Sequence, residues 1–236
     1  MPERTQRDSE ARRQVISLMF YKAAPEWRRL PAAEKQERRR DFLAVVDQWQ
    51  RGDEMKVLTY SLVGLRADCD MMLWRICYSL ECLQQMQAQL MQSGMGAYLA
   101  TPHSFLAMTR RSQYQIGRDP HHGENAVRCG VGRYATIVPF DKTRNWYQVP
   151  FPERQRIVNE YIDAIAEFPR VRMNTLYSFG LDDPEFVLVF ESDNPADMVD
   201  LKMRLRDTEN SNYVLRDSPA FTCIQCTPEE MLERLG

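Results

Sequence analysis

The chain has 236 residues, of which 44% are hydrophobic and 27% are charged, and its formal net charge is −2. This length allows one large or two small domains with a sizeable core, and the composition is typical of a globular protein. The nearly balanced charge gives no electrostatic reason to expect nucleic acid or an anionic membrane as a partner. No apolar run is long enough for a membrane span and the charged N-terminus has no signal core, so we expect a cytoplasmic protein.

The first half of the chain predicts a flexible tail and then one α+β unit. Residues 1–13 are polar, which is typical of a mobile terminus. The hydrophobic periodicity then predicts a strand at 15–21, a helix at 31–49, strands at 57–63 and 71–76, a helix at 79–92 and a strand at 104–109. This βαββαβ order defines a first unit that spans residues 14–114.

A stretch rich in glycine, residues 115–132, predicts a linker. It contains His121 and His122, which we interpret as solvent-exposed rather than metal-binding because no other ligand type lies nearby. Beyond the linker the same order of elements recurs over residues 133–236. The predicted elements are a strand at 134–139, a helix at 152–168, a hairpin at 171–178 and 185–191, a helix from Asn194, a strand at 221–225 and a capped helix from Thr227 to Gly236.

The two units also share sequence. Phe20-Tyr21-Lys22 parallels Phe140-Asp141-Lys142, and Tyr60-Ser61-Leu62-Val63-Gly64-Leu65 parallels Tyr177-Ser178-Phe179-Gly180-Leu181. An internal duplication at this long period indicates two similar α+β units rather than a solenoid of short repeats.

Common catalytic motifs are absent from the sequence. There is no phosphate loop, GxGxxG, nucleophile elbow or HExxH, which argues against a nucleotide cofactor and against the common hydrolases. Cys223 and Cys226 have the spacing of a metal or redox pair, but no second pair completes a site, and we interpret them as reduced structural thiols.

Acidic pairs recur at the matching hairpin turns, as Asp68 with Asp70 and Asp182 with Asp183. Paired carboxylates are suited to acid–base catalysis. Because the pairs recur in both copies at a turn, we favour a role in the turn or in an interface.

Several motifs together give a resemblance to a known family. They are Lys142-Thr143-Arg144-Asn145-Trp146-Tyr147, Ser178-Phe179-Gly180-Leu181-Asp182-Asp183, Leu205-Arg206-Asp207-Thr208-Glu209 and, in the first half, Tyr60 to Asp68. With these motifs the chain resembles the chlorite dismutase family, and within it the coproheme decarboxylase branch. The resemblance implies an α+β fold in which two ferredoxin-like units in tandem form a dimeric α/β barrel. It also implies a homopentamer with one heme in the C-terminal unit of each subunit.

The resemblance also assigns site residues. In active members of the family an imidazole ligates the heme iron, and a tyrosine relays oxidation to the heme propionates. Carried over by position, the place of the metal ligand falls at Tyr161 and that of the redox tyrosine at Val138. The pocket or propionate-side positions that match are Lys142, Trp146, Arg206, Ser211 and Arg128.

These two substitutions bear directly on the expected chemistry. The alkyl side chain of Val138 cannot be oxidised as a phenol can, and Tyr134, on the same strand face, lies about 13 Å away along the strand. A tyrosinate at Tyr161 is a known ligand type for ferric heme, as in catalases. Tyr161 also shares an apolar helix face with Ile157 and Ile165, so both a ligand and a core role stay open.

Three hypotheses follow. The one we favour is a binder, carrier or assembly subunit for heme or a related tetrapyrrole, without decarboxylase chemistry and with a protein client as a further partner. The second is a heme-dependent coproheme decarboxylase or peroxidase with tyrosinate ligation, in which Lys142 is catalytic. The third is a ligand-free oligomeric scaffold. Lys142, Arg206 and Ser211 favour the first over the third because buried cationic and polar groups are unfavourable without an anionic partner.

Overall fold

The computed structural model describes residues 12–114 and 126–236. The tail prediction for residues 1–11, the first part of the predicted linker and the His121-His122 pair lie outside these residues. The strands are β1 (Val15–Ala23), β2 (Met55–Ser61), β3 (Met71–Cys77), β4 (Leu99–Met108), β5 (Tyr134–Lys142), β6 (Arg172–Tyr177), β7 (Phe186–Ser192), β8 (Val214–Arg216) and β9 (Phe221–Gln225). The α-helices are α1 (Pro25–Arg29), α2 (Ala32–Arg51), α3 (Leu80–Gln92), α4 (Phe151–Ala166), α5 (Pro195–Arg206) and α6 (Pro228–Glu233), and the 3₁₀ helices are η1 (Gly96–Tyr98), η2 (Arg144–Gln148) and η3 (Glu209–Tyr213).

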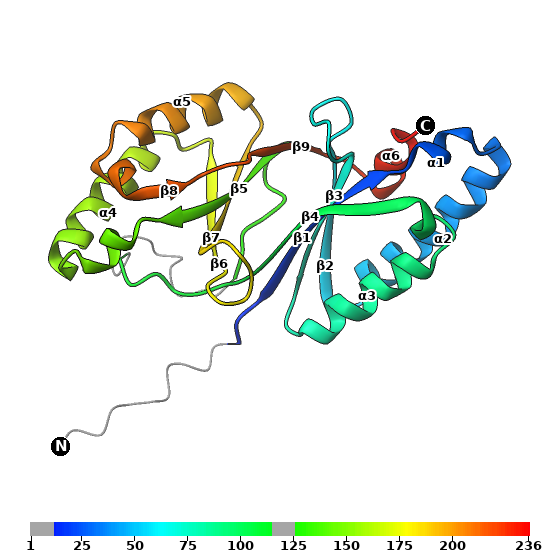
Figure 1. Ribbon diagram of the computed structural model, residues 1–236, viewed down its shortest axis with the longest axis horizontal. Coiled ribbons are helices and arrows are strands. Elements are labelled where there is room, and N and C mark those ends of the chain that lie inside the picture. Colours follow the sequence, from blue (N-terminus) through cyan, green and yellow to red (C-terminus); the bar gives the residue numbers. More distant parts are fainter. Residues whose placement is uncertain (1–11, 115–125) are drawn as a thin grey trace, which may run out of the picture.

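Within the described residues the strands form one closed antiparallel sheet. Its order is β7-β6-β4-β1-β3-β2-β9-β5-β8, and an additional pairing of β7 with β5 closes the sheet into a barrel. The strand orders β4-β1-β3-β2 and β9-β5-β7-β6 are those of two ferredoxin-like units, so the predicted fold class is confirmed. Figure 1 shows α2 and α3 on one side of the strands and α4 and α5 on the opposite side.

The two units meet at two short seams. One joins β2 to β9 through Tyr60 opposite Gln225 and Ser61 opposite Ile224, and the other joins β4 to β6 through Met108 opposite Tyr177. Because each seam contains so few regular residue pairs, further hydrogen bonds are needed to close the barrel.

Side chains from the β6–β7 turn reinforce the second seam. The Asp182 carboxylate accepts a hydrogen bond from the Leu106 backbone N–H at 2.8 Å, and the Ser178 hydroxyl donates to the Leu106 carbonyl. In the first unit, Asp70 accepts from the Ala23 backbone N–H at 3.0 Å. Asp182 and Asp70 therefore serve turns and interfaces, as we favoured from their recurrence.

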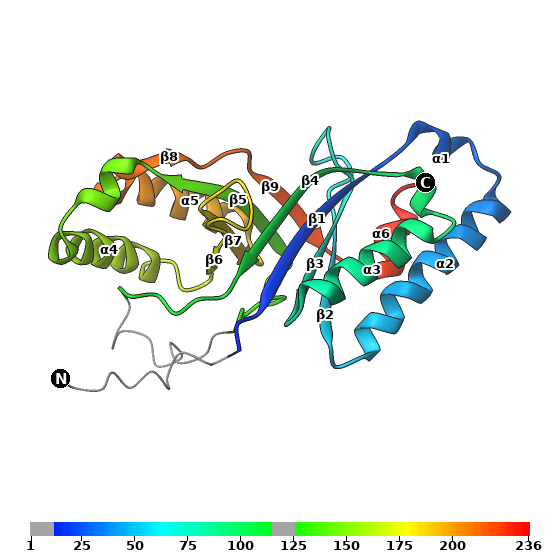
Figure 2. The ribbon, with the colours of Figure 1, turned by 60° about the horizontal axis from the view of Figure 1, so that its bottom comes forward.

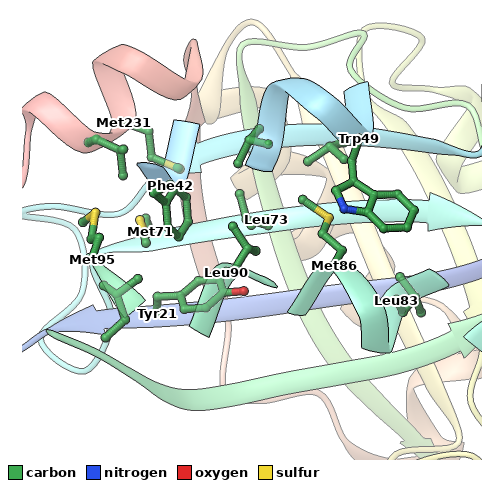
Figure 3. Close-up of a cluster of buried hydrophobic side chains, with 14 of the residues drawn as sticks. Tyr21, Phe42, Trp49, Met71, Leu73, Leu83, Met86, Leu90, Met95 and Met231 are labelled. Atoms are coloured by element: carbon green, nitrogen blue, oxygen red, sulfur yellow. The ribbon is translucent and has the colours of Figure 1, made fainter. Parts of the chain in front are cut away.

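Three apolar cores hold the layers together. The barrel interior is one core, the space between α4, α5 and the outer face of β5–β7 is another, and the first unit holds the third. In the third core, Phe42 and Trp49 from α2 meet Met86 from α3 and Met231 from α6 over the sheet (Figure 3). Helix α6 ends the chain but packs on the first unit, beside α2 (Figure 2).

The predicted and observed elements differ mainly at short or irregular segments. Strand β4 begins at Leu99 rather than at 104, with Pro102 at a register shift opposite Tyr21, where a proline does not remove a ladder hydrogen bond. Helix α6 begins with the predicted capping box but ends at Glu233, because the last residues turn back on Leu232 and Glu233. The short elements α1, β8 and the 3₁₀ helices lack a periodic signal and were not predicted.

Cys223 and Cys226 face different surroundings. Cys223 lies in the barrel interior, whereas Cys226 packs against the core of the first unit, and the six cysteines are free thiols. A joint site of this pair is therefore not formed. In the described part of the chain, no helix is both long and apolar enough to traverse a lipid bilayer.

Candidate functional site

A cavity of about 800 Å³ lies in the second unit, between α4 and the outer face of β5, β6 and β7. Ile162 and Ile165 from α4 form one apolar wall, and Phe186 and Leu188 from β7 form the opposite wall. This volume lies within the range of roughly 300–1,000 Å³ that is usual for cofactor and small-molecule sites.

The corresponding place in the first unit is filled. There Trp49 and Phe42 reach from α2 to the sheet, and α6 adds Met231 and Leu232 to the same core (Figure 3). The duplication thus produced one packed unit and one unit with a cavity, although the strand order is the same.

Lys142, at the end of β5, places a buried amine in this cavity. Its side chain is 7% exposed, and its Nζ donates to the Asn210 Oδ1 at 2.5 Å and to the Asn210 carbonyl at 3.3 Å. The Nζ also lies 4.4 Å from the ring centre of Trp146. Burial lowers the pKa of Lys142 from its ordinary value of 10.5 to about 7, and Glu185 opposes this shift only in part.

The duplicated lysine of the first unit has a different environment. Lys22, near the end of β1, donates to the Asp70 carboxylate at 2.8 Å. Glu185 occupies a similar place beside Lys142 but accepts from its backbone N–H, at 2.9 Å, rather than from its amine. The amine of Lys142 therefore faces the cavity without a carboxylate partner of the kind that neutralises Lys22.

Arginines gather around the same cavity. The five that line it are Arg110, Arg111, Arg128, Arg154 and Arg172. In the described parts of the chain no aspartate or glutamate lines the cavity, and none of the five arginines forms an ion pair with a described residue. Such unpaired cations attract carboxylate or phosphate groups of a ligand.

Tyr161 lies on the α4 wall and is partly buried. Its hydroxyl donates to the Met173 Sδ at 3.6 Å, and its ring packs against the core under α4 and α5. Burial raises the pKa of Tyr161 and the nearby Asp217 raises it further, so the phenol stays protonated at neutral pH. The side chain of Tyr161 therefore borders the cavity and the core at once.

The structure brings together four of the predicted site residues and separates three others. Arg128, Lys142, Trp146 and Tyr161 line the cavity. The three that do not line it are Val138, Arg206 and Ser211. Val138 is 1% exposed in the core beneath α4 and α5.

Arg206 and Ser211 make contacts outside the cavity. Arg206 is exposed and pairs with Asp217 at 2.5 Å, while the Ser211 hydroxyl donates to the Arg206 carbonyl at 2.9 Å. An arginine with a carboxylate partner of its own is not available to the cavity as an unpaired cation.

Several cavity residues were missed by sequence reasoning. Arg154 donates to the Tyr114 hydroxyl at 3.2 Å, and the Tyr114 ring stacks on Phe151 with ring centres 5.7 Å apart. Asn210, the partner of Lys142, lies in a 3₁₀ helix that the hydrophobic periodicity of the sequence does not predict. The adjacent pair Arg110-Arg111, three residues before the predicted linker, was an available signal of a cationic cluster.

Two ferredoxin-like units closed into one barrel, with a cavity lined by arginines and Lys142 under the first helix of the second unit, define a dimeric α/β-barrel protein. The chain belongs to the chlorite dismutase family, whose model, "Chlorite dismutase", matches residues 35–226. A coproheme decarboxylase of Mycolicibacterium smegmatis is 30% identical over 179 residues, which is 75% of each chain.

Solved structures support the fold. A chlorite dismutase from Candidatus Nitrospira defluvii in complex with imidazole superposes with a TM-score of 0.85 at 22% identity, over 94% of each chain. A variant of the same enzyme superposes with the same TM-score, identity and coverage.

Proposed function

We propose that this protein binds a carboxylated tetrapyrrole in the cavity and acts as a binder, carrier or assembly subunit, without coproheme decarboxylase chemistry. The observation that carries the proposal is the contrast between two duplicated lysines. Lys22 is neutralised by Asp70, whereas the amine of Lys142 is buried at the cavity, where its hydrogen-bond acceptors among the described residues are the neutral oxygens of Asn210. A buried cation of this kind is unfavourable until an anion joins it.

The walls and the rim of the cavity support the same class of ligand. A flat aromatic ring fits the slot between apolar side chains of α4 and those of β7. Carboxylate side chains of the ring then reach Lys142 and the arginines at the rim, where bidentate hydrogen bonds are available. Apolar walls with a cationic rim match a macrocycle that carries several carboxylates.

Iron fits the site less well than the ring does. The side chain at the position of the iron ligand is the protonated phenol of Tyr161, which donates to the Met173 Sδ. Within the described residues no histidine lines the cavity, and His103 pairs with Asp68 at 2.8 Å elsewhere.

Decarboxylase chemistry also lacks support at the second substituted position. Val138 is buried beneath the helices and offers no oxidisable group beside a ligand carboxylate. The M. smegmatis relative is a coproheme decarboxylase, whereas this chain carries a valine at position 138.

Assembly into a homopentamer, as the family resemblance implies, is part of the proposal. Val199 and Met203, spaced four residues apart on α5, are 58% and 66% exposed, and Leu215 on β8 is 70% exposed. Exposed apolar side chains of this size favour burial against another surface. A protein client that receives or delivers the tetrapyrrole remains part of the carrier proposal.

Titration with coproporphyrin III, a metal-free porphyrin with four carboxylates, tests the proposal through fluorescence quenching. We expect saturable binding that Lys142→Met weakens by about 10- to 100-fold, since a hydrogen bond to a charged group contributes about 1.5–3 kcal/mol. Lys35→Met is the matched control, because Lys35 lies on α2 and donates only to the Arg28 carbonyl. Equal affinity of the two variants, or no binding by the wild type, contradicts the proposal.

A further inference from the structure

Residues 126–132, which we call the strap, carry Arg128 to the cavity without any regular secondary structure of their own. Three side chains from other elements fix the first half of the strap. The Val127 N–H donates to the Gln14 Oε1 at 2.7 Å, and the Asn174 Nδ2 donates to the Arg128 carbonyl at 2.8 Å. The Lys56 Nζ donates to the Cys129 carbonyl at 3.3 Å.

A single carboxylate fixes the second half. The Glu191 Oε1 accepts from the backbone N–H of Gly130 at 2.7 Å and from that of Val131 at 3.3 Å. Glu191 lies on β7 and is 1% exposed, and its other oxygen has no hydrogen-bond partner among the residues that the structure describes. A buried carboxylate with an unsatisfied oxygen destabilises the fold, so its contacts with the strap come at a cost in stability.

The backbone of the strap is shaped for this contact. Gly130 has a φ of +72°, a conformation that side-chain-bearing residues rarely adopt. A Cβ on Gly132 would lie 2.5 Å from the Ser192 backbone nitrogen, directly after Glu191 in the chain. The strap therefore lies flush against the end of β7, where the Glu191 carboxylate meets it.

We propose that Glu191 is a positioning residue for Arg128, which it holds toward the carboxylates of the ligand through the strap. The inference rests on the proposed function of the cavity. Glu191 anchors the chain two residues after Arg128, and Asn174 anchors the Arg128 carbonyl itself. An arginine on an ordered backbone loses less conformational entropy on binding than one on a free loop, and so binds a carboxylate more tightly.

A double-mutant cycle with coproporphyrin III tests the coupling. We expect Arg128→Met and Glu191→Leu each to raise the dissociation constant by about tenfold, and the double variant to be no weaker than either single variant. Glu191→Gln keeps one acceptor oxygen and is expected to stay within about twofold of the wild type. Lys142→Met combined with Glu191→Leu gives the control, since their effects should multiply.

Hydrogen exchange of the strap amides separates this inference from the proposed function. In the ligand-free protein, Glu191→Leu should speed amide exchange at Gly130 and Val131 at least tenfold and leave exchange in β3 unchanged. Glu191→Gln should leave exchange in the strap unchanged. Effects of Arg128→Met and Glu191→Leu that multiply, or unchanged strap exchange in Glu191→Leu, overturn the positioning role. If the wild type binds no porphyrin but Glu191→Leu shows the faster strap exchange, the proposed function is overturned instead.

Discussion

Replacing Lys142 by methionine should stabilise the ligand-free protein, although Lys142 is part of the binding site. The displacement of the Lys142 pKa from 10.5 to about 7 corresponds to at most about 5 kcal/mol of destabilisation when the amine is charged. Methionine removes this charge with little change in volume. It also leaves the Asn210 Oδ1 without a donor, at about 1–3 kcal/mol, so we expect a net gain of about 2 kcal/mol at pH 6.

The gain should depend on pH in a defined direction. A lysine with a depressed folded-state pKa destabilises the fold fully below that pKa, and the penalty disappears as pH rises toward 10.5. The stability difference between Lys142→Met and the wild type should therefore fall by about 3 kcal/mol between pH 6 and pH 9, from a gain of about 2 kcal/mol to a loss of about 1 kcal/mol. Urea unfolding of both proteins at several pH values measures this difference.

The duplicated lysine provides the control. Lys22→Met leaves the Asp70 carboxylate without its cationic partner at 2.8 Å, so it should lower the free energy of unfolding by about 2 kcal/mol. Opposite signs for the two variants support the account of an uncompensated cation at the cavity. If Lys142→Met destabilises the protein at pH 6 as much as Lys22→Met does, the reasoning is refuted.

Two further predictions concern ligand binding. The affinity for coproporphyrin III should fall as pH rises above about 7, because Lys142 then loses its proton before the carboxylate binds. Isothermal titration at pH 6 and pH 8.5 measures this fall, and an unchanged affinity would exclude Lys142 as the anchor. Tyr161→His should give ferric coproporphyrin the absorption spectrum of an imidazole complex and leave the affinity for metal-free coproporphyrin within about twofold of the wild type. If the wild type already shows an imidazole or tyrosinate spectrum, our reading of Tyr161 is wrong.

The fold was largely predictable because its periodic signals are strong. The matching motifs around Lys22 and Lys142 indicated a duplication, and the capping signals at Asn194 and Thr227 marked two helix starts that the structure confirms. The closure of the barrel was expected from the family resemblance alone. Its seams depend on single side-chain contacts such as that of Asp182 with Leu106, which no local pattern reveals.

The site was predictable only in part, for a physical reason. Lys142, Trp146 and Tyr161 sit on or beside regular elements at motif positions, and the structure brings them to one cavity. Of the arginines that line the cavity, three lie in irregular segments, whereas Arg154 lies on α4 and Arg172 on β6. Their shared property is the lack of an ion pair with any described residue, which appears only in three dimensions. For the same reason sequence alone could not tell that Arg206 pairs with Asp217.

The most direct test of the central claim compares coproporphyrin III with its tetramethyl ester, which has the same ring but no charge. If unpaired cations at the cavity select the carboxylates, the wild type should bind the acid at least about 100-fold more tightly than the ester, since two or more charge-assisted hydrogen bonds are lost. Equal affinity for the acid and the ester would contradict the account.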